Sequence, residues 1–474
     1  MSNIVSFCIK KPLFFVFFLL IFHKYDNMYL VISMFRYINI KNYKSLDNLT
    51  VDFTKTKVST KKMVAIYGEN GIGKSNFAEI FYTFHEILRT MSIKDLIKQF
   101  MDDPNNSNLD IKSINAIIKR QFKNIQTIIS ECKTINSKDN LVLEFGFSYN
   151  NKNGQYRIEM NDSEIVYESL DYVLCKNQVN FFTISKQNMK INEKMFKDNS
   201  YVREIIEMIE KYWGNHSLLS ILNYEFEDKN KSFIISKFDS SIIDILYFFN
   251  CISVRIKQGR GAEFTLVGVS HEIFGQLENG SISQKKKKEL RNTEQLLNDF
   301  FTSLYSDIDS VYYKTEEDDN ELKYQLFVRK KVNKRIIEVS FRDESTGTQN
   351  LLGLLPFIIA AIEGQVVVID EFETGIHDLL VEEIIEKMYD SIQGQLILTT
   401  HNTRLLESQL PRSIMYLLRY NNSKNNKELI PFDCYERVQK NINLRKRYLS
   451  GYYNVNEKKH FSISRLMSFM DDDE

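Results

Sequence analysis

Residues 63–75 read M-V-A-I-Y-G-E-N-G-I-G-K-S and decide the fold of this chain. The apolar run 63–67 predicts a buried strand, and helical periodicity begins at Ser75, so a glycine-rich loop joins a strand to a helix. The loop is a complete G-x-x-x-x-G-K-S motif. Its backbone N–H groups and the helix N-terminus would point at phosphate groups. In this context we favour a nucleotide phosphate site over an incidental glycine turn.

The loop and the first helical turn supply the candidate ligands of that nucleotide. Lys74 would neutralise the outer phosphates, and Ser75 would ligate Mg²⁺. The predicted cofactors are therefore ATP and Mg²⁺. The residues expected to bind the nucleotide here are Gly68, Asn70, Gly71, Gly73, Lys74, Ser75 and Asn76.

A second buried strand ends in two carboxylates at residues 366–371, V-V-V-I-D-E. Ligands bind at the carboxyl ends of strands in open α/β sheets. Asp370 would hold Mg²⁺ through its water shell, and Glu371 could take a proton from the attacking water. Acidic pairs are common at helix N-termini, so this pair alone would not indicate a catalytic site. It does so only together with the glycine-rich loop.

A third apolar strand, L-I-L-T-T-H at residues 396–401, ends in His401. This histidine could hydrogen-bond a γ-phosphate or position the water. A lone histidine at a strand end is more often structural, and only the order of the motifs raises His401 above that alternative.

Further strands and helices follow from periodicity. We expect a hairpin from 35–42 and 49–53, and a helical run over 349–363. The region 176–300 is predicted to be mostly helical, without a sustained heptad pattern. The other predicted strands are 141–147, 156–160, 165–172, 311–313, 322–328 and 336–341.

Composition indicates a folded protein with a large core, because 43% of the 474 residues are hydrophobic. Lys plus Arg and Asp plus Glu total 62 each, so any nucleic-acid contact needs a local patch. The five cysteines are scattered, which favours a reducing, cytoplasmic setting over a disulfide framework. The apolar run 13–22 is too short to span a bilayer; we favour an upstream extension over a membrane-attaching segment, and a membrane partner is not expected.

Together these motifs resemble the ABC ATPase superfamily. The resemblance is to the branch with SMC and double-strand-break-repair heads, overcoming-lysogenization-defect ATPases, and bacterial AAA-type anti-phage and abortive-infection ATPases. It covers residues 34–80 and 311–408 best, and I-K-N-Y-K-S at 40–45 looks like the opening strand of that branch. Glu371 matches the catalytic glutamate of the family, and His401 matches its switch histidine.

In that resemblance, S-T-G-T-Q at 345–349 stands where the ABC signature falls. Ser345 and Gly347 would then bind the γ-phosphate held by an opposite subunit. Read alone, the stretch predicts an ordinary helix N-cap at Ser345. The threonines at 346 and 348 depart from the transporter pattern L-S-G-G-Q, which disfavours a transporter subunit.

Other matches are less specific. Residues 373–377, E-T-G-I-H, occupy the D-loop position, and the Q-loop glutamine cannot be placed. Lys44 corresponds to a basic residue near the nucleotide in repair-type heads, or is a solvated lysine. The basic stretch 441–451 looks like a closing R-x-Y-L-x-G element, which either contacts nucleic acid or a partner or is a solvated helix. We interpret Lys285–Lys288 as a solubilising loop.

The predicted fold is α/β: a P-loop NTPase of the ABC-head type with a mixed or antiparallel β lobe and a large helical insertion. The expected divisions are an apolar extension at 1–33, core segments at 34–83 and 311–418, the β lobe and helical insertion at 84–310, and a basic C-terminal segment at 419–474.

The predicted function is ATP binding and hydrolysis by a homodimer or higher oligomer around two ATP. It would control a separately encoded nuclease or toxin in prokaryotic anti-phage defence, since no nuclease constellation is visible in the sequence. The alternatives are an SMC-like DNA-repair or chromosome-associated head, which would bind nucleic acid, and a transport ATPase.

Overall fold

The computed structural model describes residues 33–56, 59–93, 95, 97–98, 123–174, 176–258, 261–265, 272–318, 321–435 and 443–453. The predicted extension 1–33 therefore lies outside the described residues, except for Ser33. No helix in the described ranges is long and apolar enough to cross a membrane.

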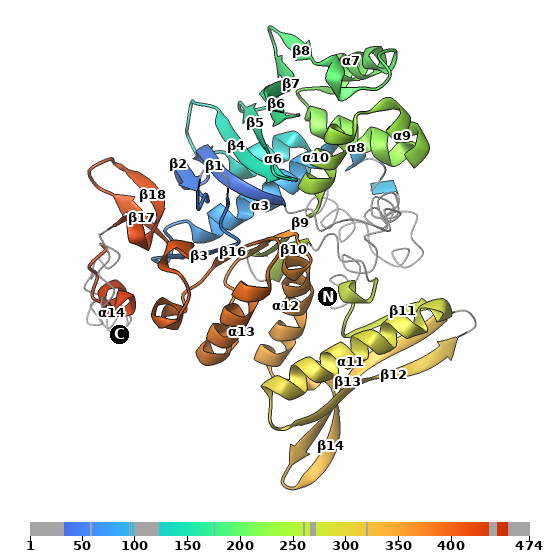
Figure 1. Ribbon diagram of the computed structural model, residues 1–474, viewed down its shortest axis with the longest axis vertical. Helices are drawn as coiled ribbons and strands as arrows, with labels where there is room; N and C mark the ends of the chain where they lie inside the picture. Colours follow the sequence, from blue (N-terminus) through green and yellow to red (C-terminus); the bar gives the residue numbers. More distant parts are fainter. Residues whose placement is uncertain are drawn as a thin grey trace, which may run out of the picture.

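The central sheet has seven strands in the order β10-β9-β15-β16-β3-β17-β18 (Figure 1). The five inner strands run parallel, and the two edge strands are antiparallel. The strands are β3 (Met63–Gly68), β9 (Ile252–Gln258), β10 (Gly261–Thr265), β15 (Val366–Ile369), β16 (Gln395–Thr399), β17 (Met415–Asn421) and β18 (Asn426–Pro431).

Both faces of this sheet are covered, which explains the unbroken apolar runs in its strands. Val64 and Ile66 of β3 face α3 (Lys74–Leu88) and the β lobe in one core cluster. Met63 and Ala65 face α12 (Thr346–Ile362) and α13 (Asp378–Ser391) in a second cluster. The carboxyl ends of β15, β16 and β3 therefore lie side by side at one edge.

The β lobe is an antiparallel seven-stranded sheet in the order β2-β1-β4-β5-β6-β7-β8. Its strands are β1 (Ser33–Tyr43), β2 (Leu46–Asp52), β4 (Leu141–Tyr149), β5 (Lys152–Met160), β6 (Ile165–Val173), β7 (Gln178–Ser185) and β8 (Met189–Ile191). The predicted hairpin and the three predicted strands between 141 and 172 are confirmed.

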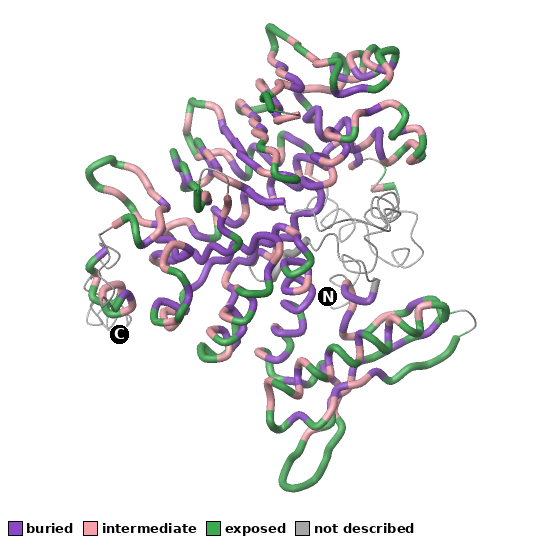
Figure 2. Tube along the Cα trace, in the orientation of Figure 1, coloured by how far each residue is buried: buried purple, intermediate pink, exposed green. Residues whose placement is uncertain are grey.

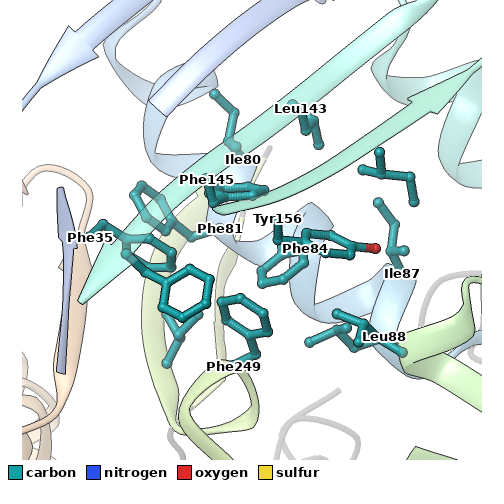
Figure 3. Packing of buried hydrophobic residues seen from close by; sticks show 14 of the residues in the cluster. Phe35, Ile80, Phe81, Phe84, Ile87, Leu88, Leu143, Phe145, Tyr156 and Phe249 are labelled. Atoms are coloured by element: carbon teal, nitrogen blue, oxygen red, sulfur yellow. The ribbon is translucent and has the colours of Figure 1, made fainter. Parts of the chain in front are cut away.

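Aromatic side chains fix this lobe on α3 (Figure 3). The ring centroids of Phe84 and Phe145 are 4.6 Å apart, and those of Phe35 and Phe81 are 5.3 Å apart. Such contacts add to the burial of large apolar surfaces. The helix that starts at the phosphate loop is thus held along its length.

The region 176–300 is less helical than predicted. It contains α7 (Tyr201–Tyr212), α8 (Leu218–Asp228), α9 (Lys231–Lys237) and α10 (Ser240–Asn250), but also β7 to β11. The main correction is β9, I-S-V-R-I-K-Q, which pairs in parallel with β15 and belongs to the central sheet. Its serine and arginine interrupt the apolar run, so periodicity alone did not mark a buried strand.

A four-stranded antiparallel sheet, here called the outer sheet, precedes α12. It consists of β11 (Asn279–Ser283), β12 (Ile308–Asp318), β13 (Glu321–Val332) and β14 (Arg335–Ser340), with α11 (Lys287–Leu304) on one face (Figure 1). These strands contain those predicted at 311–313, 322–328 and, except for its last residue, 336–341. Lys285–Lys288 form a 3-10 turn and the start of α11, so the predicted loop is wrong.

Glu168 is a buried anchor between the β lobe and α8. Its carboxylate accepts hydrogen bonds from Trp213 Nε1 (2.9 Å), Leu218 N (2.7 Å) and Tyr156 Oη (2.9 Å). Burial raises the pKa of Glu168, and these donors oppose the rise. The carboxylate therefore satisfies two buried donors, from Tyr156 and Leu218, and the partly buried Trp213.

We predict that Glu168→Ala lowers the free energy of unfolding by about 3 kcal/mol or more, because several buried donors lose their acceptor. Urea denaturation measures the loss. Glu207→Ala is the control, since that side chain is exposed on α7 and its removal should cost about 0.5 kcal/mol or less. Equal stability of the two variants would contradict the anchoring role.

Candidate functional site

The phosphate loop leaves β3 at Gly68 and enters α3 at Lys74. Gly71 and Gly73 have φ angles of 78° and 117°, which favour glycine. A side chain at residue 68 would place its Cβ 2.6 Å from the carbonyl oxygen of Leu418. The glycine pattern is therefore required by backbone angle and by close approach.

The Lys74 ammonium lies over this loop. Its Nζ donates to the carbonyl oxygens of Gly68 (2.9 Å) and Glu69 (3.0 Å). Burial lowers the pKa of Lys74, while the nearby carboxylates of Asp370, Glu373 and Glu371 oppose the decrease. The amine is thus a buried cation at the N-terminus of α3, where it can pair with a phosphate group.

Asp370 and Ser75 meet although 295 positions separate them in the numbering. Burial raises the pKa of Asp370, and hydrogen bonds to its carboxylate from Thr399 Oγ1 (2.5 Å) and from Ser75 oppose the rise. Thr399 stands at the end of β16, between β15 and β3, and sequence analysis did not assign it a role. The glycine loop and the acidic strand end therefore form one site.

The donor set at this point fits Mg²⁺. A serine hydroxyl and one carboxylate are oxygen ligands, and Mg²⁺ commonly takes its remaining ligands from water and substrate phosphates. No group of three or more His, Cys, Asp or Glu side chains that could hold a metal occurs in the described ranges. The serine–carboxylate pair and the absence of a larger ligand cluster both fit a Mg²⁺ site whose coordination shell is completed by phosphate oxygens and water.

Glu371 is held in a left-handed conformation with φ of 50°. Its N–H donates to Thr399 Oγ1 at 2.8 Å, and its carbonyl oxygen accepts from Thr374 Oγ1 at 2.9 Å. Non-glycine residues in this region cost energy and cluster at functional sites. The turn therefore directs Glu371 away from the course of β15.

His401 is tied to the acidic turn through its backbone N–H, which donates to the carboxylate of Glu373. The second carboxylate oxygen of Glu373 is buried without a hydrogen-bond partner. Burial, followed by the charge of Lys74, lowers the pKa of His401, which favours the neutral imidazole. Glu373 is a residue of the site that sequence analysis placed only in the D-loop position.

The signature stretch begins α12. Ser345 is its N-cap, accepting from Thr348 N at 3.2 Å, so the ordinary capping interpretation is correct for the local structure. A Cβ at residue 347 would lie 2.3 Å from the carbonyl oxygen of Gly375. Residues 345–350 thus pack on the turn after β15, and within the described part of the chain they make no hydrogen bond to residues 68–76.

The sequence matches a family model described as "AAA domain, putative AbiEii toxin, Type IV TA system" over residues 63–407. The chain belongs to this AAA family. The match spans every element of the site described so far, so the fold is that of an AAA-type P-loop ATPase. The comparison with curated proteins gave no match.

Three solved structures are similar to the chain. The SMC head domain from Thermotoga maritima is 13% identical, with 84% of this chain and 98% of that chain covered and a TM-score of 0.33. An SmcHead bound to the C-winged helix domain of ScpA is 11% identical, covering 85% and 99%, with a TM-score of 0.39. An Smc head from Pyrococcus furiosus bound to the C-terminal domain of ScpA is 12% identical, covering 90% and 100%, with a TM-score of 0.37.

The remaining predicted residues of the AAA site are placed as follows. Asn70 is exposed on the loop, and Asn76 Nδ2 donates to Ser45 Oγ at 2.8 Å, toward the β1–β2 turn. Lys44 pairs with Glu79 of α3 at 2.5 Å. β9 ends at Gln258, three residues beyond Arg255, which pairs with Ile369 of β15.

The closing element packs against the phosphate loop in its described part, 443–451. The Tyr448 and Tyr67 ring centroids are 5.9 Å apart, and a hydrogen bond with the Gly68 backbone lowers the pKa of Tyr448, although burial raises it more. Arg445 bonds Glu407 at 2.8 Å, just after the His401 segment. α14 (Leu444–Leu449) therefore supports the site, and is not only a solvated basic helix.

Proposed function

We propose that this chain binds ATP with Mg²⁺ and hydrolyses it to ADP and phosphate. The convergence of Lys74, Ser75 and Asp370 carries this proposal, since it joins a phosphate cation to an oxygen-ligand pair at a helix N-terminus. The family description supports the same assignment. We infer that this ATPase acts in prokaryotic anti-phage defence, in the cytoplasm. It would do so by controlling a separately encoded effector.

In the proposed reaction the loop N–H groups and Lys74 stabilise the charge on the transferred phosphoryl group. Ser75 would bind Mg²⁺ directly and Asp370 through water, and the ion would neutralise phosphate charge. Glu371 would accept the proton of the attacking water, and neutral His401 would hydrogen-bond the same region. Each role uses a side chain at the carboxyl edge of the central sheet.

The signature stretch supports a dimer around two nucleotides. Ser345 is the N-cap of α12 and Gly347 lies in its first turn, where an anion is favoured. Because they make no hydrogen bond to their own phosphate loop within the described residues, we propose that they complete the site of a second subunit. A homodimer would contain two such shared sites.

The effector is proposed to be a nuclease or toxin encoded apart from this chain. The family description names a toxin of a type IV toxin–antitoxin system, which supports a defence role. An SMC-like head would need long paired helices, yet the longest helix in the described ranges is α11, with 18 residues packed on its own sheet. We therefore prefer the defence ATPase.

Mixing two inactive variants tests the shared site. Lys74→Ala removes the phosphate cation, and Ser345→Arg blocks the signature, so each homodimer should be inactive. A mixed dimer would join the intact loop of one subunit to the intact signature of the other, restoring roughly a quarter of wild-type ATP turnover under random pairing, from site counting. If the mixture stays inactive and Ser345→Arg alone still dimerises with ATP, the shared site is wrong.

A further inference from the structure

The outer sheet has one covered face and one open face. α11 packs on the side chains of Leu322, Leu326 and Val328. Strand alternation places Tyr312, Phe327 and Arg329 on the opposite face, where Tyr312 pairs directly across from Phe327. The β13–β14 hairpin on this sheet projects from the rest of the chain and is exposed along most of its length (Figure 2).

Two aromatic rings and several cations lie together on the open face. Arg329 lies 4.8 Å from the Tyr312 ring centroid, and Lys314 Nζ lies 4.1 Å from that of Phe327. The ring centroids themselves are 6.3 Å apart. Lys331 continues this row toward the hairpin turn, which adds Lys334, whereas Arg335 pairs with Val332 and lies on the opposite face.

The acidic groups near these cations are exposed partners. Glu338 bonds Tyr312 and Lys314 and is 37% exposed, and Asp309 pairs with Lys331 at 3.3 Å and is 33% exposed. Exposed ion pairs are weak and readily exchanged. The other acidic residues of the face, Glu316, Asp318 and Glu321, gather at the far β12–β13 end.

We propose that the open face of the outer sheet binds single-stranded nucleic acid, with bases stacked on Tyr312 and Phe327 and phosphates held by Arg329, Lys331 and the hairpin turn. Stacking platforms flanked by cations bind single strands with little sequence preference. The cations that now cover the rings can pair with phosphates when a base takes their place. Duplex bases remain stacked on each other and would not reach the rings.

The position of the sheet links such binding to the ATP site, and this part rests on the proposed function. Lys330 of β13 pairs with Glu344 at 3.0 Å, and the Glu344 side chain is only 3% exposed. Gln349 Nε2 donates to the Glu344 carbonyl oxygen at 2.8 Å. Glu344 immediately precedes Ser345, so a change at the hairpin can reach the signature through the Lys330–Glu344 pair, although Lys330 also pairs with Asp307 at 3.1 Å.

Binding is tested on the full-length chain without ATP, by fluorescence anisotropy with labelled dT20 and U20. Wild type should bind both, and an unlabelled duplex should compete at least about tenfold less well. Tyr312→Leu and Phe327→Leu should each weaken binding roughly tenfold, whereas Tyr312→Phe should not. With about three phosphate contacts, the log-log salt slope should be near −2.

Lys331→Gln and Lys323→Gln form a matched pair. The two lysines are 58% and 55% exposed, lie on the same face, and each pairs with one aspartate, but Lys323 is at the acidic end. Only Lys331→Gln should weaken binding, by a few-fold. Equal effects, equal competition by duplex, or no binding would overturn the site. The site would also be overturned if the wild type formed dimers without nucleotide and the Tyr312, Phe327 or Lys331 variants were monomeric. The open face would then bind a second copy of the chain.

Coupling is measured separately as ATP turnover with and without dT20. We expect the oligonucleotide to raise turnover in wild type, and Lys330→Met to bind it equally well without the increase. Binding without any change in wild-type turnover would overturn the coupling and leave the binding site standing. An inactive wild type that still binds dT20 would count against the proposed ATPase alone.

Discussion

Replacing Glu371 with glutamine is expected to leave ATP binding intact while slowing hydrolysis about 10²- to 10⁴-fold. Glutamine keeps the size and polarity of the side chain but cannot accept the proton of the attacking water. The contacts that fix the backbone of residue 371 come from Thr399 and Thr374, and Thr374 Oγ1 also reaches the carboxylate at 3.4 Å, a contact that a glutamine side-chain oxygen can still accept. ATP should therefore accumulate on the variant together with the dimer.

Single-turnover hydrolysis and light scattering with ATP and Mg²⁺ measure these two effects. Glu383→Gln is the control, because that residue is on α13, is 54% exposed and pairs with Lys387. It should turn over at the wild-type rate. If Glu371→Gln also did so, Glu371 would have no role as the base.

Lys74→Ala is expected to weaken ATP binding roughly hundredfold or more, because charge-assisted contacts to two phosphates are lost. The substitution also leaves the carboxylates of Asp370 and Glu373 without their nearest buried cation. Their repulsion of a polyphosphate adds to the loss. Isothermal titration calorimetry with a non-hydrolysable ATP analogue measures the affinity.

The matched control for this variant is Lys387→Ala, since Lys387 is 73% exposed on α13. Its affinity for the analogue should equal that of wild type. Thermal melting of both variants separates loss of binding from loss of fold, because Lys74 also bonds the loop carbonyls. A folded Lys74→Ala protein with full affinity would exclude residues 68–75 as the phosphate site.

The centre of this site could be predicted from sequence because its motifs are local. A buried strand, glycines that must adopt positive φ, and a lysine at the helix start all lie within residues 63–75. The acidic strand end is equally local. What could not be predicted is the register that aligns them, which depends on β16 lying between β3 and β15.

The residues that sequence analysis missed act through contacts distant in the chain. Thr399 matters because it bridges Asp370 and the Glu371 backbone, and Tyr448 because α14 folds back on the phosphate loop. Thr399 has no local pattern that marks it, and the closing motif that contains Tyr448 did not indicate a contact with the phosphate loop. β9 was missed for a different reason: Ser253 and Arg255 alternate with the buried Val254 and Ile256, so the strand lacks the unbroken apolar run of its neighbours.

In the outer sheet, too, the separate strands could be predicted from sequence, but their pairing could not. Its strands were predicted one by one from alternation, with the exact bounds left open. Their pairing into one sheet, with α11 on a single face, brings Tyr312 beside Phe327 and the cations around them. A surface of this kind exists only once the strands are assembled.

The central claim is that the glycine loop and the acidic strand end hold one Mg²⁺–ATP together. A crystal structure of Glu371→Gln grown with ATP and Mg²⁺ tests it most directly. We predict the ion bound to Ser75 Oγ, with Asp370 reaching it through water and Lys74 on the outer phosphates. Nucleotide bound elsewhere, or an ion that contacts neither Ser75 nor the water shell of Asp370, would contradict the claim.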